Sequence, residues 1–226
     1  MRSTLVVFAL LFVSAPSFAQ APDKPEVRAF TEFTGKGIEA KDYEFTVSGY
    51  KYEILSRGQG KREDEKGAVR GFNLRLSGYY LDGQIYYAEY RNDVLLICET
   101  SDSESGSGFI TRLDGKTLAM KWKRIIRGFN VGQGLLEGNY AYVTAIGFVG
   151  KVNLDTGAYA WKHDSLYADT KKTGRYSDDD FNSFELPKVE GDAVLFTERD
   201  TYRNPPQTLK VNKRTGKIIP APLMPG

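Results

Sequence analysis

The residues best suited to metal chemistry lie in the acidic run SDDDFNSFE. Asp178, Asp180 and Asn182 occupy alternate positions, as the oxygen ligands of Ca²⁺ do at the start of an EF-hand loop. Such a loop also needs glycine at its sixth place and glutamate at its twelfth, where this chain has Ser183 and Val189. We therefore expect a solvated loop that binds calcium weakly at most.

His163, the only histidine, is the residue that acid–base catalysis would most need. A zinc site would require several further ligands, and a Ser-His-Asp triad would require a nucleophile motif such as G-x-S-x-G, which the sequence lacks. Asp164 follows directly, but adjacent side chains on a strand point to opposite faces. We expect a structural or surface histidine and assign no catalytic residue. An enzyme with a carboxylate or metal site stays an alternative. A carboxylate pair for sugar hydrolysis could be present among the many Asp and Glu residues, but no sequence feature identifies which two would form it.

Cys98 is the only cysteine, so the chain cannot form an internal disulfide. It lies in the apolar run VLLICET, which favours a buried small hydrophobe over a reactive thiol. An exported chain without a disulfide must be stabilised by packing.

Two segments have compositions typical of binding surfaces. KWKRIIR sets four cations around a tryptophan, which suits an acidic partner, although charges on an exposed strand also prevent edge-to-edge pairing. In GYYLDGQIYYAEY, alternation would send one ring of each tyrosine pair to each face of a sheet. One face would join the core and the other would offer the amphipathic area common in protein interfaces and sugar platforms. The predicted binding surface comprises Tyr79, Tyr80, Tyr86, Tyr87, Lys121, Lys123, Arg124 and Arg127.

The N-terminal residues MRSTLVVFALLFVSAPSFAQ have the form of a secretory signal, with a basic start, an apolar run and small residues before the cleavage position. We expect a mature chain that begins between Gln20 and Pro22 and works in the periplasm or outside the cell. The apolar run is shorter than the ~20 residues of a membrane-spanning helix, and no cysteine follows it for lipid attachment. A formal net charge of +2 gives no reason to expect a nucleic-acid partner.

The elements that must position these residues are predicted to be β-strands, because alternating runs rich in Val, Ile, Tyr, Phe and Thr recur between turn residues. Asp82-Gly83 is predicted to close a two-residue hairpin, and Arg91-Asn92-Asp93 to form the next bend. Residues 57–66 are predicted to form a charged, solvated loop. The expected organisation is a signal peptide (1–19), an N-terminal arm or first strand (20–42) and a single all-β domain (43–226).

Two kinds of segment repeat three times along the chain. YRNDVLLICET, LEGNYAYVTA and VEGDAVLFTE each place a turn before an apolar strand, with Asn92, Gly138 and Gly191 aligned at the turn. GFITRLDGKT, GKVNLDTGAY and TLKVNKRTGKI each end a strand in a second turn. The period is close to the ~40 to 50 residues of a propeller blade. The structural residues predicted from the repeat are the turn glycines Gly115, Gly157 and Gly216, and Trp122 and Trp161 as wedges between neighbouring sheets.

The stretches GKVNLDTGAYAWKH and RLDGKTLAMKW resemble the repeat of pyrroloquinoline-quinone-like (PQQ-like) β-propellers, in which strands and an Asp-x-x-Gly-like turn precede an aromatic residue. The resemblance covers residues 91–220 and implies antiparallel meander sheets arranged as a partial or small propeller of about three to four blade-like units. Catalytic members are much longer and carry Ca²⁺ and a disulfide of neighbouring cysteines, which a single cysteine excludes. The resemblance therefore implies a short, non-catalytic member without a quinone or another cofactor.

These observations predict an exported, non-catalytic binding module. Its expected partner is a protein of the periplasm, as for an envelope scaffold or a partner that neutralises an exported toxin. The alternatives are a module that binds carbohydrate or an envelope polymer on its tyrosines, and the enzyme considered above. Self-association stays open, because so few blades leave room for a second chain to complete the sheets.

Overall fold

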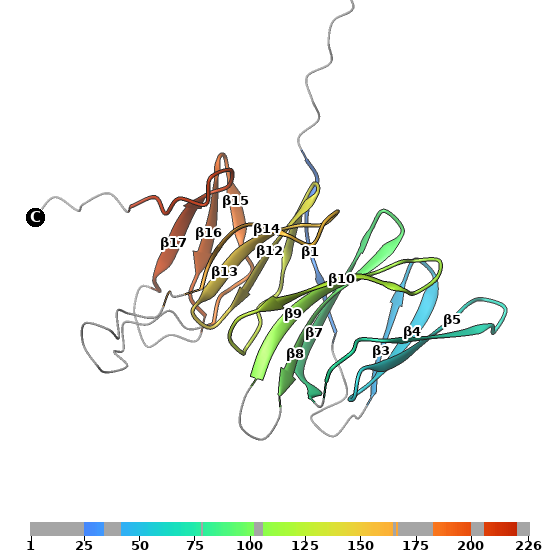
Figure 1. Cartoon of the computed structure of the whole chain (residues 1–226). Helices are drawn as coiled ribbons and strands as arrows, with labels where there is room; N and C mark the ends of the chain where they lie inside the picture. Colours follow the sequence, from blue (N-terminus) through green and yellow to red (C-terminus); the bar gives the residue numbers. More distant parts are fainter. Residues whose placement is uncertain are drawn as a thin grey trace, which may run out of the picture.

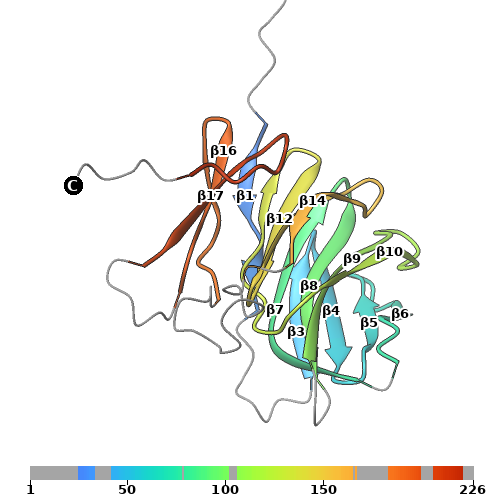
Figure 2. The same cartoon turned by 60° about the vertical axis from the view of Figure 1, so that its left-hand side comes forward.

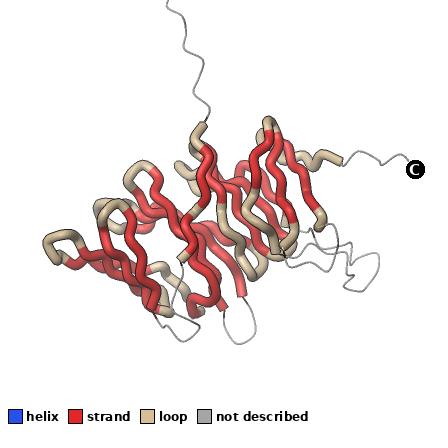
Figure 3. The backbone as a smooth tube through the Cα atoms, turned by 180° about the vertical axis from the view of Figure 1, so that it is seen from behind, coloured by secondary structure: helices blue, strands red, loops and turns tan. Residues whose placement is uncertain are grey.

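The computed structural model describes residues 25–33, 42–77, 79–101, 106–164, 166, 183–199 and 206–220. Within these residues all regular structure is β-strand and every strand pairing is antiparallel, so the prediction of an all-β chain is confirmed (Figure 3). Figure 1 shows four separate sheets that follow one another in chain order, none of them closed into a barrel. No helix in the described ranges is long and apolar enough to cross a membrane.

The four sheets have the following members, in the order of their hydrogen-bonded neighbours. The first sheet contains β3 (Asp42–Val47), β4 (Tyr50–Leu55), β5 (Gln59–Glu63) and β6 (Val69–Asn73). The second contains β10 (Met120–Ile126), β9 (Gly106–Leu113), β8 (Asp93–Ser101), β7 (Tyr80–Tyr90) and β2 (Thr31–Glu32). The third contains β1 (Val27–Ala29), β11 (Leu135–Glu137), β12 (Tyr140–Ala145), β13 (Phe148–Asn153) and β14 (Tyr159–His163). The fourth contains β15 (Lys188–Glu190), β16 (Ala193–Thr197) and β17 (Thr208–Asn212).

The N-terminal strands β1 and β2 tie the two middle sheets together. β1 pairs with β11 of the third sheet, and β2 pairs with β7 of the second sheet (Figure 2). Between them, Phe30 is fully buried among residues of both sheets. Part of the segment expected to be an arm or a first strand is therefore strand, and it spans one junction between sheets.

Each pair of successive sheets encloses a hydrophobic core, three in all. In β8, Leu95 and Ile97 face the third sheet, whereas Leu96 and Cys98 face the first. Because β8 is covered on both faces, it is apolar throughout rather than alternating, which explains the run VLLIC. The burial predicted for Cys98 is confirmed. The outer face of the first sheet instead carries cross-strand ion pairs, Lys51–Glu44 and Lys61–Glu53.

Two local predictions were wrong. Asp82-Gly83 does not close a hairpin: β7 runs through it with a β-bulge between Asp82 and Ile85, at which Gly83 has a φ of +66°. A glycine at positive φ serves a bulge as well as a hairpin turn, so the dipeptide alone does not separate the two. Residues 57–66 are not a solvated loop, since β5 pairs with β4 on one side and with β6 on the other.

The hairpin turns repeat in all four sheets and define one edge of the molecule, here called the turn rim. In the structure, the first residue of each turn shows that Arg91 is equivalent to Gly138 and Gly191. The sequence alignment had matched these glycines with Asn92, which is one residue too late. The bend predicted at Arg91-Asn92 is confirmed, with φ values of +50° and +64°. The sequence search missed the repeat in the first sheet. The four turns are Ser48-Gly49, Arg91-Asn92, Gly138-Asn139 and Gly191-Asp192.

A second turn follows β9, β13 and β17, one in each of the last three sheets. The carboxyl or amide oxygens of Asp114, Asn153 and Asn212 each accept hydrogen bonds from backbone N–H groups two and three residues later. Four residues after each of them the chain adopts a positive φ, at Leu118, Gly157 and Gly216. The residue equivalent to Gly157 and Gly216 is therefore Leu118, not Gly115 as predicted.

Candidate functional site: the arginine groove

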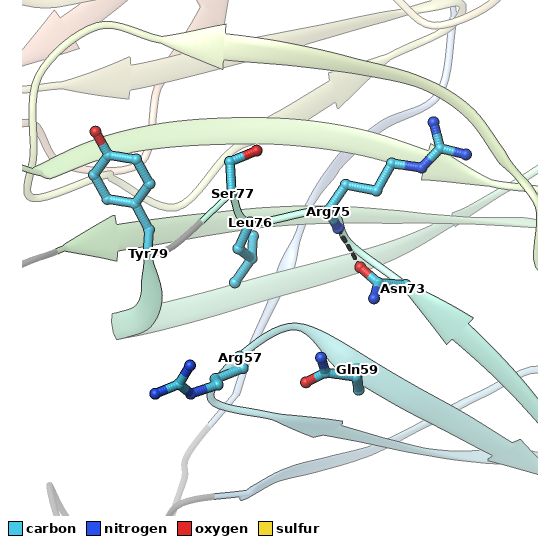
Figure 4. Close-up of a pocket in the computed structure, with 7 residues that line it drawn as sticks. All are labelled: Arg57, Gln59, Asn73, Arg75, Leu76, Ser77 and Tyr79. Carbon is cyan, nitrogen blue, oxygen red and sulfur yellow. Dashed lines mark hydrogen bonds between the residues drawn. The ribbon is translucent and has the colours of Figure 1, made fainter.

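A groove of ≈ 510 Å³ lies beside the first sheet, where β5 begins and β6 ends. Figure 4 shows basic, amide, hydroxyl and phenol side chains around it, and none of the described residues that line it carries a carboxylate. We call it the arginine groove. Its lining residues are Arg57, Gln59, Asn73, Arg75, Leu76, Ser77 and Tyr79.

Tight packing of the backbone fixes both walls of the arginine groove. A Cβ added to Gly58, at φ +80°, would lie 2.7 Å from the Leu76 side chain, so the turn after β4 approaches the segment after β6 closely. The Leu74 N–H donates to the Gly58 carbonyl at 2.8 Å, and the Leu81 N–H donates to the Ser56 carbonyl at 2.6 Å. Leu74 and Leu76 are buried in the core between the first and second sheets.

The wall between Leu74 and Tyr79 has an unusual backbone. Arg75 and Ser77 have φ values of +54° and +29°, a region that residues other than glycine occupy only when their surroundings hold them there. The Asn73 amide oxygen accepts the Arg75 N–H at 2.5 Å (Figure 4), and the Lys123 ammonium of β10 donates to the Leu74 and Arg75 carbonyls at 3.1 and 3.3 Å. These bonds turn Arg75 and Ser77 outward while both neighbouring leucines stay in the core.

The two arginines of the groove carry charge that the described residues do not neutralise. The Arg57 guanidinium donates to the Tyr80 hydroxyl at 2.7 Å and lies 4.8 Å from the centroid of its ring. Neither Arg57 nor Arg75 forms an ion pair with a carboxylate in the described residues. Arg112, in contrast, is buried and paired with Asp93 at 2.5 Å. A groove lined by two guanidinium groups, amides and a phenol is suited to hold an oxyanion such as a carboxylate.

The predicted tyrosine surface divides into two parts. Tyr79 and Tyr80 are 37% and 42% exposed and lie at the arginine groove. Tyr86 is 2% exposed in the core towards the third sheet, and Tyr87 is half-buried, stacked on Phe45 at 4.7 Å between ring centroids. Alternation does send this pair to opposite faces, but sheets cover both faces of β7, so neither ring is free to form a binding surface.

The predicted basic residues serve mainly inside the molecule. Lys121 pairs with Asp93 and Asp114 at 2.7 and 3.0 Å, and its hydrogen bond from the ammonium to Asp93 raises the pKa of Lys121. Lys123 supports the groove wall, and burial lowers its pKa. Arg124 donates to the Gly157 carbonyl at 2.6 Å, and Arg127 is exposed. Of these four cations, only Lys123 reaches the arginine groove.

The two tryptophans join successive sheets through the second turn of the repeat. The Trp122 indole N–H donates to the Leu154 carbonyl at 3.1 Å, and the Trp161 indole N–H donates to the Lys213 carbonyl at 3.0 Å. A Cβ on Gly157 or Gly216 would lie 2.6 Å from the Trp122 or Trp161 ring, respectively. Gly115 has a different role, since a Cβ there would overlap the Asn92 carbonyl.

His163 hydrogen-bonds through Nε2 with the Gly216 carbonyl at 2.8 Å, at the position in its sheet that Arg124 holds in the preceding one. Cys98 is fully buried, which raises the pKa of its thiol well above the ordinary value. In the described residues no group of three His, Cys, Asp or Glu side chains could hold a metal. The calcium candidates Asp178, Asp180 and Asn182 lie outside the described residues.

Sequence reasoning missed the arginine groove because it assigned Arg57 and Gln59 to a solvated loop. The segment LRLS could have indicated one wall of the groove. Leu74 and Leu76 alternate with Arg75, a pattern that predicts an extended stretch with both leucines in the core and Arg75 outside. Its contact with residues 56–58 depends on how β4, β5 and β6 pair, which local composition does not determine.

In comparisons with known proteins, no family model and no curated protein matches the chain. Among solved structures, the chain is similar to a computationally designed protein, Ika8, at 11% sequence identity, with 77% of this chain and 71% of that chain covered. The TM-score is 0.26, so this similarity carries no argument.

Proposed function

We propose that the protein is an exported, non-catalytic binding module that holds an acidic segment of a protein partner in the arginine groove. One observation carries the proposal: Arg57 and Arg75 line an open groove of ≈ 510 Å³, and no carboxylate lines it in the part of the chain that the structure describes. Guanidinium groups bind carboxylates in bidentate geometry, and side-chain amides and a phenol add neutral hydrogen bonds. A periplasmic scaffold or a toxin-neutralising partner would use such a site.

The same proposal includes the architecture and the location. The four successive sheets, with their repeated turns and inter-sheet tryptophans, support a PQQ-like partial propeller that needs no quinone. The signal-like N-terminus supports export to the periplasm. Fractionation of cells that express the full chain, with N-terminal sequencing of the product, tests the location: intact Met1 in the cytoplasm would contradict it.

Titration of the protein with a blocked oligoglutamate peptide tests the site. We expect saturable binding that weakens as salt rises, and a loss of about tenfold or more in affinity for Arg75→Gln, since a hydrogen bond to a charged group contributes about 1.5 to 3 kcal/mol. Arg127→Gln is the matched control, because Arg127 is an exposed cation that does not line the groove. Equal affinities of the two variants would contradict the proposal.

A second candidate ligand is an acidic carbohydrate or envelope polymer. The exposed ring of Tyr79 favours it, because it lines the same groove as the Gln59 and Asn73 amides, a combination that suits sugar hydroxyls; exposed Tyr80 contacts Arg57 of that groove. Tyr79→Ala separates the two candidates: it should abolish binding on a glycan array if a sugar stacks there, and should reduce peptide affinity only slightly if the arginines dominate.

A further inference from the structure

A second groove, of ≈ 610 Å³, opens at the turn rim between the first and second sheets. We call it the rim groove. Its walls come from the turn before β4, the hairpin of β5 and β6, and the two turns of the second sheet. The side chains used below are Tyr50, Arg62, Arg70, Asp93, Asp114 and Lys121.

Two arginines of the rim groove stand directly opposite each other. Arg62 of β5 pairs in register with Arg70 of β6, so both side chains leave the same face of the first sheet. Like charges at directly opposite positions are destabilising. Neither arginine forms an ion pair with a carboxylate of the described residues.

Arg62 is held in place without neutralisation of its charge. It is 9% exposed, its guanidinium lies 4.4 Å from the Tyr50 ring centroid, and it donates to the carbonyls of Gly115 and Lys116. Arg70 is exposed at the mouth of the rim groove. A fixed cation inside and an exposed one directly opposite form a ready clamp for an anion.

Among the described residues, the carboxylates that line the rim groove are Asp93 and Asp114, and both are already engaged. Asp93 accepts hydrogen bonds from Arg112, Lys121 and the Gly115 N–H. Asp114 accepts hydrogen bonds from the N–H groups of its own turn and pairs with Lys121 at 3.0 Å. They therefore balance Lys121 and the buried Arg112 and leave the Arg62–Arg70 pair unneutralised.

The equivalent pairs in the next two sheets identify what is unusual about Arg70. Arg112 stands opposite Trp122 in the second sheet, and Lys151 stands opposite Trp161 in the third. Lys151 repeats the arrangement of Arg62 closely: its ammonium lies 4.1 Å from the Tyr140 ring centroid and donates to a turn carbonyl of the following sheet. In the first sheet, Arg70 thus occupies the position that a tryptophan holds in the second and third sheets.

We propose that the rim groove binds a tetrahedral oxyanion group, a phosphate or a sulfate, between Arg62 and Arg70. Such a group carries up to two negative charges and enough oxygens to accept hydrogen bonds from both guanidinium groups, whereas one carboxylate offers a single charge. The groove volume leaves space for the rest of a phosphorylated or sulfated molecule. This site is separate from the arginine groove and does not depend on the function proposed there.

Calorimetric titration of the full chain with inorganic phosphate at constant ionic strength tests the proposal. We expect a phosphate site whose affinity is at least tenfold weaker in Arg70→Gln and unchanged in Arg75→Gln, which removes a cation of the arginine groove instead. Arg70→Gln is preferred to a change of Arg62, which is buried and anchors the second sheet. Without phosphate, the melting temperature of Arg70→Gln should be no lower than that of the wild type, because a like-charge contact is removed.

A second variant and two further ligands keep the test decisive. Arg70→Trp should reproduce the arrangement of the second and third sheets, abolish phosphate binding and raise the melting temperature. Tighter binding of glycerol 3-phosphate than of inorganic phosphate would support an esterified ligand. Three results would each overturn the proposal: acetate binding by Arg75→Gln as strong as its phosphate binding, equal phosphate affinity of Arg70→Gln and the wild type, or no binding of phosphate or sulfate by the wild type.

Discussion

The junction between the second and third sheets differs from the two outer junctions at the turn rim. There the Tyr90 hydroxyl donates to Asn139 and Asp155 at 3.1 and 3.0 Å, and Arg91 pairs with Asp155 at 2.9 Å. The outer junctions keep grooves of ≈ 610 and ≈ 640 Å³ at the same level. The middle junction is thus closed by side chains and additionally bridged by β1 and β2, whereas the outer ones are open to ligands.

A single hydrogen-bond acceptor recurs at all three junctions, although its donors differ. The second residue of the Asp or Asn turn offers its carbonyl to the preceding sheet, at Gly115, Leu154 and Lys213. A cation donates at every junction, and a tryptophan joins it at the last two. Stability should therefore depend most on the tryptophans, and anion binding is expected at the junction where Arg70 takes the place of the tryptophan.

The largest effect should come from Trp161→Ala. The ring is 9% exposed in the core between the third and fourth sheets, and truncation of such an aromatic costs about 3 to 5 kcal/mol in the free energy of unfolding. Urea denaturation followed by circular dichroism measures it. Trp161→Phe is the control, which keeps most of the buried area but loses the hydrogen bond to Lys213, and should cost less. If Trp161→Ala left the free energy of unfolding unchanged, the fourth sheet would not depend on this ring.

Gly157→Ala should have the next largest effect. The new methyl would lie 2.6 Å from Trp122 at a φ of +70°, so steric overlap and backbone strain together should cost about 2 to 4 kcal/mol. Gly191→Ala is the matched control, because Gly191 has a φ of +55° and nothing within 4 Å of its added methyl. The free energy of unfolding of Gly191→Ala should fall only by the backbone strain, about 1 to 2 kcal/mol. Equal losses would mean that the close approach of Trp122 contributes nothing.

Asp93→Asn should cost about 2 kcal/mol, since it removes the charge that balances buried Arg112 while leaving that arginine its bond to the Leu154 carbonyl. Burial alone would raise the pKa of Asp93, but hydrogen bonds from Lys121, the Gly115 N–H and Arg112 outweigh it and hold the pKa below the ordinary value. A lowered folded-state pKa stabilises the fold above the unfolded pKa of about 4, and this contribution is lost as the pH falls further.

The pH dependence of the variant checks this sign. The difference in unfolding free energy between the wild type and Asp93→Asn should be constant near neutral pH and should shrink below about pH 4. A difference that stayed unchanged down to pH 3 would mean that Asp93 does not supply the acid sensitivity.

The sequence predicts the fold class and much of the repeat because those depend on local signals. The alternating runs and the turns at Arg91-Asn92 and Asp155-Thr156-Gly157 can be identified within about ten residues, as turn chemistry allows. The bulge at Asp82-Gly83 could not be separated from a hairpin, because both need the same positive φ.

Apart from Tyr79 and Lys121, the residues that line the two grooves were not predicted as binding residues from the sequence, because they come together through cross-strand register. Arg62 and Arg70 are eight positions apart and become neighbours only when β5 pairs with β6. The charged composition of residues 57–66, which include Arg62, had indicated a loop instead of a strand. Tyr86 and Tyr87 show the opposite failure: their alternation was correct, but their burial depends on sheets contributed by distant segments.

The smallest effect should come from His163→Ala, which tests whether the only histidine has more than a supporting role. His163 is half-exposed, and its single described hydrogen bond, to the Gly216 carbonyl, occupies the place that Arg124 fills in the preceding sheet. A partly exposed neutral hydrogen bond contributes about 0.5 to 1.5 kcal/mol, and water can replace it at the surface, so the loss should stay below about 1 kcal/mol. Arg124→Ala is the internal comparison and should lose slightly more, because its donor is charged and lies at the junction that Trp122 also seals. If His163→Ala instead destabilised the protein as much as Trp161→Ala, the fourth sheet would be held by the histidine rather than by the packed indole.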